Sequence, residues 1–178
     1  MDRRTLLSGA GALVAAQALS IGADARAIPS PVQADDAKFM QLAVDAAKQG
    51  DYPFGAVIVR DGHLLATGFN SSRRDADPTA HGEMVAIRTF LTQHSPDEFK
   101  GTTLYTSGEP CVMCMGAIVW CGIGRVVFAA SIAELSSRIG QIDITAKQIA
   151  NATPFAAIDI TGGVLSAEAM RLFPGPKP

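Results

Sequence analysis

The sequence predicts an α/β fold in which helices cover a mixed β-sheet. Segments of helical periodicity alternate with short apolar runs typical of strands, and one hairpin lies early in the chain. The chain has 178 residues, of which 48% are hydrophobic and 18% charged, so its composition suits a packed core and argues against disorder. We expect one folded domain over 35–173, preceded by a linker at 28–34 and followed by a tail at 174–178.

Periodicity and turn residues predict the first elements. Apolar side chains three and four residues apart indicate a helix over 35–49. Apolar runs at 54–59 and 64–69 flank Asp61-Gly62, a dipeptide typical of tight hairpin turns, and these runs are predicted strands.

Acid–proline pairs predict the start of two further helices. Asp77-Pro78 opens one and Glu109-Pro110 opens another over 111–120, because an acidic residue can cap a helix and proline suits its first turn. Residues 131–153 are ambiguous and are interpreted as a loop with a helix around 144–149. The remaining patterns predict three strands and a terminal helix: strands over 102–106, 125–130 and 155–160, and a helix over 166–173.

A split motif indicates the chemistry of this chain. His81-Gly82-Glu83 is followed, after a long gap, by Pro110-Cys111-Val112-Met113-Cys114. One imidazole and two thiolates supply three zinc ligands, whereas a structural zinc site normally has four protein ligands. The fourth position is therefore open to water, and the carboxylate of Glu83 is free to move protons. The motif predicts a zinc-activated water beside a proton shuttle.

The predicted helices favour this chemistry. Cys111 and Cys114 lie three residues apart in a first helical turn, so both sulfur atoms face one side. The partial positive charge of a helix N-terminus favours thiolate over thiol, and His81 also lies near the start of a helix. We expect Glu83 to accept the proton of water and to pass it to departing ammonia, after attack on an amidine-like ring carbon.

Simpler interpretations remain for the separate parts of the motif. A lone C-x-x-C pair can be structural or redox-active. A zinc-binding domain without catalysis would need a fourth protein ligand, for which Cys121 and His94 are the candidates. Glu109 is interpreted as a loop residue that positions the motif, and Trp120 as a core residue.

The N-terminus has the features of an export signal. Arg3-Arg4 precede an uncharged segment over 5–23 that is rich in Ala, Leu and Gly, and Ala25-Arg26-Ala27 fits a small-x-small cleavage site. The pattern predicts twin-arginine export to the periplasm and cleavage of residues 1–27. An uncleaved membrane anchor is the alternative, which the glycines of the apolar segment weaken.

The charge of the remaining chain bears on its partners. Without residues 1–27 it keeps 12 basic and 15 acidic residues, a net charge of −3. A protein whose affinity depends on phosphate contacts should be basic. We therefore expect a small neutral molecule as substrate, with no nucleic acid partner and no stable membrane span.

These residues resemble the cytidine deaminase-like superfamily, and more closely its guanine deaminase, cytosine deaminase and tRNA adenosine deaminase branch. The matching stretches surround the motif: 53–59, 77–83, 104–120 and 123–128. The resemblance implies a three-layer α-β-α sandwich with a five-stranded mixed sheet, and a homodimer. It implies Zn²⁺ bound by His81, Cys111 and Cys114, with Glu83 as the catalytic proton shuttle.

The resemblance also implies a set of substrate-binding residues: Asn70, Phe54 and Ala80. The stretches 53–55 and 117–120 are similar to guanine deaminases, Gly82 to fungal-type cytosine deaminases, and 160–165 to the tRNA-editing branch. These features rank a free purine base first, with guanine before the others, then cytosine, then a nucleoside, and tRNA last.

Overall fold

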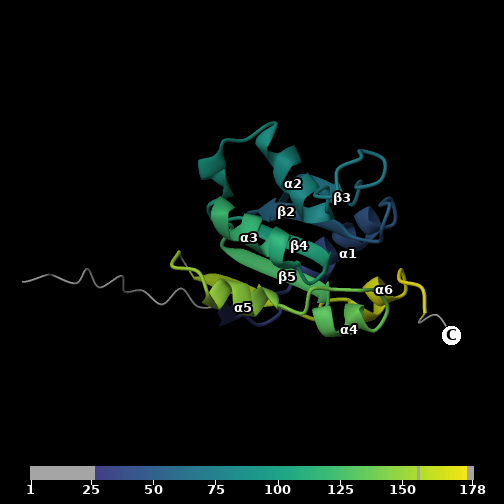
Figure 1. Cartoon of the computed structure of the whole chain (residues 1–178). Coiled ribbons are helices and arrows are strands. Elements are labelled where there is room, and N and C mark those ends of the chain that lie inside the picture. Colours follow the sequence, from purple (N-terminus) through teal and green to yellow (C-terminus); the bar gives the residue numbers. More distant parts are fainter. Residues whose placement is uncertain (1–26, 156, 176–178) are drawn as a thin grey trace, which may run out of the picture.

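The computed structural model describes residues 27–155 and 157–175, so all of the export signal predicted over 1–27 except Ala27 lies outside the described residues. The described chain forms a mixed sheet covered by helices on both faces, the expected three-layer α-β-α sandwich (Figure 1). Six strands lie in the order β1-β6-β5-β4-β2-β3: β1 (Ala27–Pro29), β2 (Gly55–Arg60), β3 (His63–Phe69), β4 (Thr103–Gly108), β5 (Arg125–Ala130) and β6 (Ile158–Thr161). Neighbours from β1 to β4 are parallel, and β2 is antiparallel to both β4 and β3.

One strand more than the predicted five lies at the edge of the sheet. β1 pairs with β6, with Ala27 opposite Ile158. It joins the last residue of the predicted export signal to the first two residues of the segment that we expected to be a linker. The backbone N–H of Ser30 extends this pairing by donating to the Ile160 carbonyl at 3.0 Å. A strand of three residues that ends in proline carries no alternating pattern, so the sequence does not indicate it.

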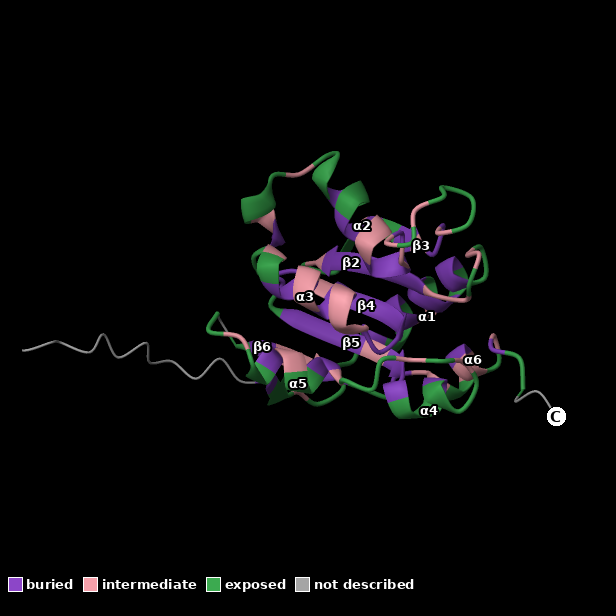
Figure 2. Cartoon of the chain, in the orientation of Figure 1, coloured by how far each residue is buried: buried purple, intermediate pink, exposed green. Residues whose placement is uncertain are grey.

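The helices pack two separate cores against the sheet. One face carries α2 (Gly82–Leu91), α3 (Val112–Cys121) and α5 (Ala146–Asn151), and the other carries α1 (Asp36–Ala47), α4 (Ile132–Ser136) and α6 (Ser166–Met170). A 3₁₀ turn, η1 (Pro96–Phe99), follows α2. Successive residues of β2 alternate between the cores, because strand side chains point to opposite faces. Figure 2 shows the central strands β2, β4 and β5 as mainly buried segments.

Gly68 allows α2 to lie directly on β3. A Cβ atom at this position would meet the backbone nitrogen of Ala86 at 2.2 Å and the carbonyl oxygen of Gly82 at 2.3 Å. Both are backbone atoms of α2, so a side chain would force the helix away from the sheet. The close contact fixes the N-terminus of α2, where the predicted site begins.

A buried ion pair joins α1 to the sheet. Arg125 of β5 donates to both carboxylate oxygens of Asp36, at 2.7 and 2.8 Å, and the hydroxyl of Tyr105 donates to the same carboxylate at 3.0 Å. Burial alone would raise the pKa of Asp36. Hydrogen bonds from Arg125, the backbone of Gln33 and Tyr105 outweigh burial and hold this pKa below its ordinary value of 3.8.

Two further expectations differ from the structure. The helix predicted from Asp77-Pro78 begins later, at Gly82, because the Asp77 carboxylate accepts hydrogen bonds from the N–H and hydroxyl of Thr79 and closes a turn instead. Trp120 is 78% exposed rather than part of the core, and it packs on Phe155. Because α3 contains no charged residue, its periodicity does not reveal which face lies outward.

In the described part of the chain, none of the helices has the length and apolarity that crossing a membrane requires.

Candidate active site

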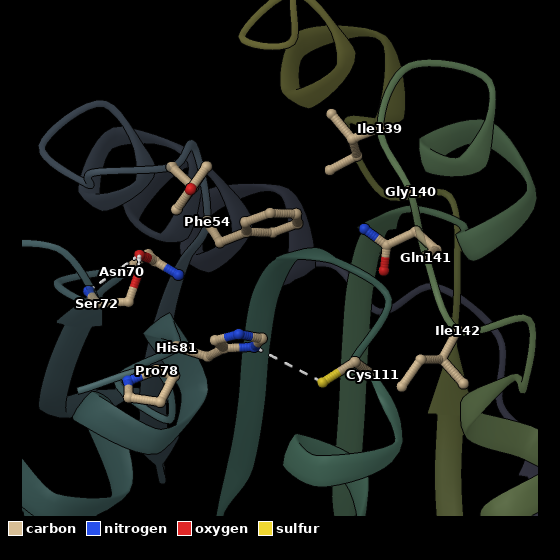
Figure 3. Close-up of a pocket in the computed structure, with 11 residues that line it drawn as sticks. Phe54, Asn70, Ser72, Pro78, His81, Cys111, Ile139, Gly140, Gln141 and Ile142 are labelled. Atoms are coloured by element: carbon tan, nitrogen blue, oxygen red, sulfur yellow. Dashed lines mark hydrogen bonds between the residues drawn. The ribbon is translucent and has the colours of Figure 1, made fainter. Parts of the chain in front are cut away.

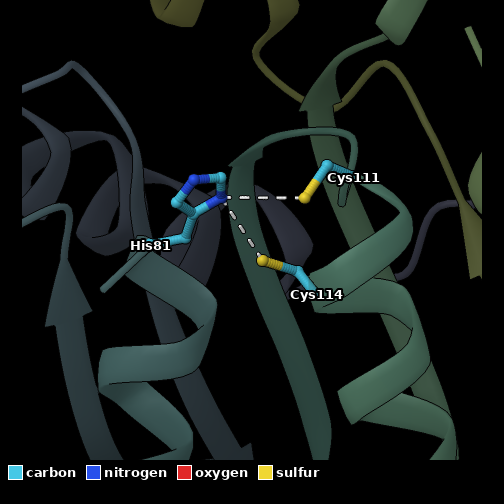
Figure 4. A group of neighbouring side chains, drawn as sticks. All are labelled: His81, Cys111 and Cys114. Atoms are coloured by element: carbon cyan, nitrogen blue, oxygen red, sulfur yellow. Dashed lines mark hydrogen bonds between the residues drawn. The ribbon is translucent and has the colours of Figure 1, made fainter. Parts of the chain in front are cut away.

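The three predicted zinc ligands meet where two neighbouring helices begin. His81 is the N-cap residue of α2 and Cys111 that of α3, while Cys114 lies in the first turn of α3. Both sulfur atoms lie 3.6 Å from Nδ1 of His81 (Figure 4). All three ligand atoms are within 4.8 Å of one another.

These separations fit a tetrahedral zinc ion. Zn–S bonds of about 2.3 Å and a Zn–N bond of about 2.05 Å at tetrahedral angles place sulfur and nitrogen about 3.6 Å apart. Two thiolates and an imidazole are also a donor set that zinc prefers. Over the described residues the cluster contains these three ligands alone. His94 instead stacks on the ring of Phe90, with 4.5 Å between centroids.

Contacts among the ligands separate their pKa values. The hydrogen bond from the thiol of Cys114 and then the nearby His81 lower the pKa of Cys111 to about 4. The interaction with Cys111, together with burial, raises the pKa of Cys114. The hydrogen bond with Cys111 also raises the pKa of His81. Zinc is bound by thiolates, so both cysteines are deprotonated when the metal is held.

Glu83 lies beside this cluster in the first turn of α2. Its side chain is 4% exposed, and it lines a cavity of about 50 Å³ together with His81 and Cys111. Burial, first of all, and then the negative charge of Cys111 raise the pKa of Glu83. A carboxyl group with a raised pKa beside an open ligand position is suited to take up and release protons.

A larger cavity of about 530 Å³ shares four lining residues with the small one: Phe54, His81, Cys111 and Gln141. Asn70 also lines it, and its Oδ1 accepts hydrogen bonds from the N–H and hydroxyl of Ser72, at 3.2 and 2.9 Å. This arrangement leaves the amide nitrogen of Asn70 facing the cavity (Figure 3). The ring of Phe54 is supported from behind by Phe173, with ring centroids 5.2 Å apart.

Two of the three predicted substrate-binding residues, Phe54 and Asn70, thus line the cavity. Ala80 does not: it is buried, and its carbonyl accepts the N–H of Ser71. Its contact with a substrate stays a prediction.

Sequence reasoning did not identify one wall of the cavity. This wall comes from the loop between α4 and α5 and consists of four residues: Ile139, Gly140, Gln141 and Ile142. The loop shows no periodicity and no motif, so only its place in the fold identifies it. Tyr52 also lines the cavity and was not identified from the sequence.

Comparison with known proteins agrees with this site. A family model described as the cytidine and deoxycytidylate deaminase zinc-binding region matches residues 33–130. The guanine deaminase of Bacillus subtilis is 43% identical over 97 residues, which are 52% of this chain and 62% of that protein. The tRNA-specific adenosine deaminase of Aquifex aeolicus is 38% identical over 96 residues, 52% of this chain and 64% of that protein. The match therefore spans less than two thirds of either relative.

Among solved structures, the crystal structure of NE0047 in complex with 2,6-diaminopurine has a TM-score of 0.66 and 26% sequence identity. The superposition covers 80% of this chain and 81% of that one.

Proposed function

We propose that this chain, which belongs to the cytidine and deoxycytidylate deaminase zinc-binding family, removes the amino group of a free purine base, with guanine as its preferred substrate. The family and the three-ligand cluster make it a zinc-dependent deaminase. The observation that carries the proposed mechanism is the buried Glu83 carboxyl in the small cavity beside His81 and Cys111.

The proposed reaction replaces the exocyclic amino group of the ring with oxygen and releases ammonia. Zinc, when bound, lowers the pKa of water so that a nucleophile forms near neutral pH. Glu83 takes the proton from the attacking water and delivers it to the departing amino group, so one carboxyl group serves both proton transfers. The small cavity limits the water around Glu83, which keeps the transferred proton on the reacting groups.

The larger cavity suits a flat heterocycle. Phe54 offers a fixed aromatic ring for stacking, and the amide nitrogen of Asn70 offers a donor to a ring carbonyl or ring nitrogen. NE0047 binds the purine 2,6-diaminopurine, and the relative from Bacillus subtilis is a guanine deaminase. These likenesses support a purine base with guanine first, and cytosine or a nucleoside as alternatives.

A second candidate is adenosine in tRNA. The tRNA-specific adenosine deaminase of Aquifex aeolicus is nearly as similar to this chain as the guanine deaminase. The net charge of −3 without residues 1–27 disfavours this candidate, because binding to a phosphate backbone requires positive charge.

We also propose that the enzyme acts outside the cytoplasm, on the basis of the twin-arginine pattern in residues 1–27. Secretion of a reporter enzyme fused to these residues would support this location. Retention of the reporter in the cytoplasm would contradict it.

Ammonia release by the zinc-loaded chain tests the substrate. The panel contains guanine, adenine, cytosine, their nucleosides and an RNA stem-loop with an unpaired adenosine. Turnover of guanine above all others is the expected result. Turnover of cytosine or a nucleoside alone would agree with the proposed deamination mechanism but would contradict guanine as the preferred substrate. Turnover of the RNA, with binding that weakens steeply as salt rises, would favour the second candidate.

A further inference from the structure

Glu109, two residues before the zinc ligand Cys111, is a buried carboxylate with two backbone partners. Its Oε2 accepts the N–H of Ile132 and its Oε1 accepts the N–H of Ala146, each at 2.9 Å. These two residues are the first of α4 and of α5. A single side chain therefore binds the N-termini of two helices.

The two helices border the loop that forms one wall of the substrate cavity. Ser131 and Thr145 cap α4 and α5 locally, but each accepts an N–H three residues further on and leaves the first N–H of its helix unpaired. Glu109 accepts the first N–H of each helix, one with each carboxylate oxygen. Glu109 thus anchors the start of α4, the helix before the loop over 137–145, and the start of α5, the helix after it.

The anchor itself is rigid. The N–H of Glu109 donates to the carbonyl of Ala130 at 2.7 Å, and this bond extends the pairing of β4 with β5. A Cβ atom on the preceding Gly108 would meet side-chain atoms of Leu135 and Phe54, each at 3.0 Å. The end of β4 therefore packs closely against α4 and the ring of Phe54.

Gln141 is the polar side chain that this loop brings to the site. It lines both cavities, together with His81 and Cys111, and Figure 3 shows its amide on the side of the cavity opposite Asn70. An amide can donate and accept at once, so it can distinguish an amino group from a carbonyl on a ring edge. Its position depends on how the loop is held.

We propose that Glu109 is a positioning residue, which fixes the loop over 137–145 so that Gln141 contacts the edge of the substrate ring. The proposal rests on the proposed function, since it names the residue that selects among ring substrates. Glu109 also lines the small cavity that holds Glu83, but each of its carboxylate oxygens already accepts a backbone N–H, so its assigned role is positioning rather than proton transfer.

Glu109→Gln tests the proposal in the zinc-loaded full chain. Glutamine keeps the size but turns one of the two acceptors into a donor that faces a backbone N–H. Amide hydrogen exchange over 137–145 should accelerate about tenfold, and the KM for guanine should rise about tenfold while the zinc content stays that of wild type. Gln141→Ala should raise KM by a similar factor, and the double variant should be no worse than the single variants.

Glu134→Gln is the matched control. Glu134 also caps α4, by accepting the N–H and hydroxyl of Ser131, but it is exposed and lines neither cavity. This variant should leave KM and the exchange over 137–145 unchanged. If Glu109→Gln does not fold, Glu109→Asp replaces it, because the shorter side chain cannot reach both amides.

Wild-type exchange over 137–145 in the Glu109 variant would overturn the proposal. So would a KM for the double variant that equals the product of the increases in the two single variants. The exchange result does not depend on turnover. If wild type deaminates none of the bases, the proposed function fails while the exchange comparison still decides the role of Glu109.

Discussion

Asn70 presents its amide nitrogen to the cavity because its oxygen is already bound. The N–H and hydroxyl of Ser72 donate to Oδ1 at 3.2 and 2.9 Å, which fixes the orientation of the amide. In Asn70→Asp, one carboxylate oxygen can keep both of these bonds. The second oxygen then replaces the donor and faces the substrate as an acceptor.

The expected loss follows from two effects. One hydrogen bond to the substrate disappears, which costs about 1 kcal/mol, and an acceptor of the ring is left buried without a donor, which costs about 1–2 kcal/mol more. The sum of about 2–3 kcal/mol corresponds to a decrease in kcat/KM of about 30-fold to 150-fold. Ser72→Ala removes the hydroxyl bond alone and should lower kcat/KM about fivefold, because the amide is then less firmly oriented.

Ammonia release from guanine measures both variants, with zinc content and thermal unfolding as controls for an intact fold. A kcat/KM for Asn70→Asp within about threefold of wild type, in a folded and zinc-loaded protein, would refute the assigned contact.

The remaining predictions concern the fold and the metal. Asp36→Asn should lower the free energy of unfolding by about 3 kcal/mol, measured in urea, because it leaves the buried Arg125 without its counter-charge. The pKa of Asp36 is lowered in the folded state, so its stabilisation is present above the ordinary value of 3.8 and is lost as pH falls below it. The unfolding free energy of Asp36→Asn should therefore depend less on pH than that of wild type below about pH 4, and equal slopes would contradict this. Cys114→Ser should weaken zinc binding more than about 100-fold in a chelator competition, whereas Cys121→Ser, outside the cluster, should match wild type.

The sequence predicts the zinc site well because the ligands are set by local structure. His81, Cys111 and Cys114 stand at or near helix starts, and cap residues and short spacings are visible in a sequence. The strand from 125 to 130 is predicted with its observed bounds, since the continuous apolar run over 126–130 suits a buried parallel strand.

The cavity wall could not be predicted, because it depends on contacts between distant residues. Glu109 is interpreted from sequence as a loop residue that positions the motif, but its partners Ile132 and Ala146, which the sequence does not indicate, lie 23 and 37 residues further along the chain. Gln141 lies in a loop without periodicity, and its place at the cavity follows from where α4 and α5 begin. The edge strand β1 was missed for a related reason. Its three residues are too few to show a strand pattern, and their pairing with the distant strand β6 defines them as a strand.

Turnover by Glu83→Gln tests the central claim most directly. Glutamine preserves the shape of the side chain but cannot take the proton of water. With zinc content equal to that of wild type, ammonia release from the preferred base should fall by at least about 100-fold. Turnover at the wild-type rate by the zinc-loaded variant would show that Glu83 is not the proton shuttle.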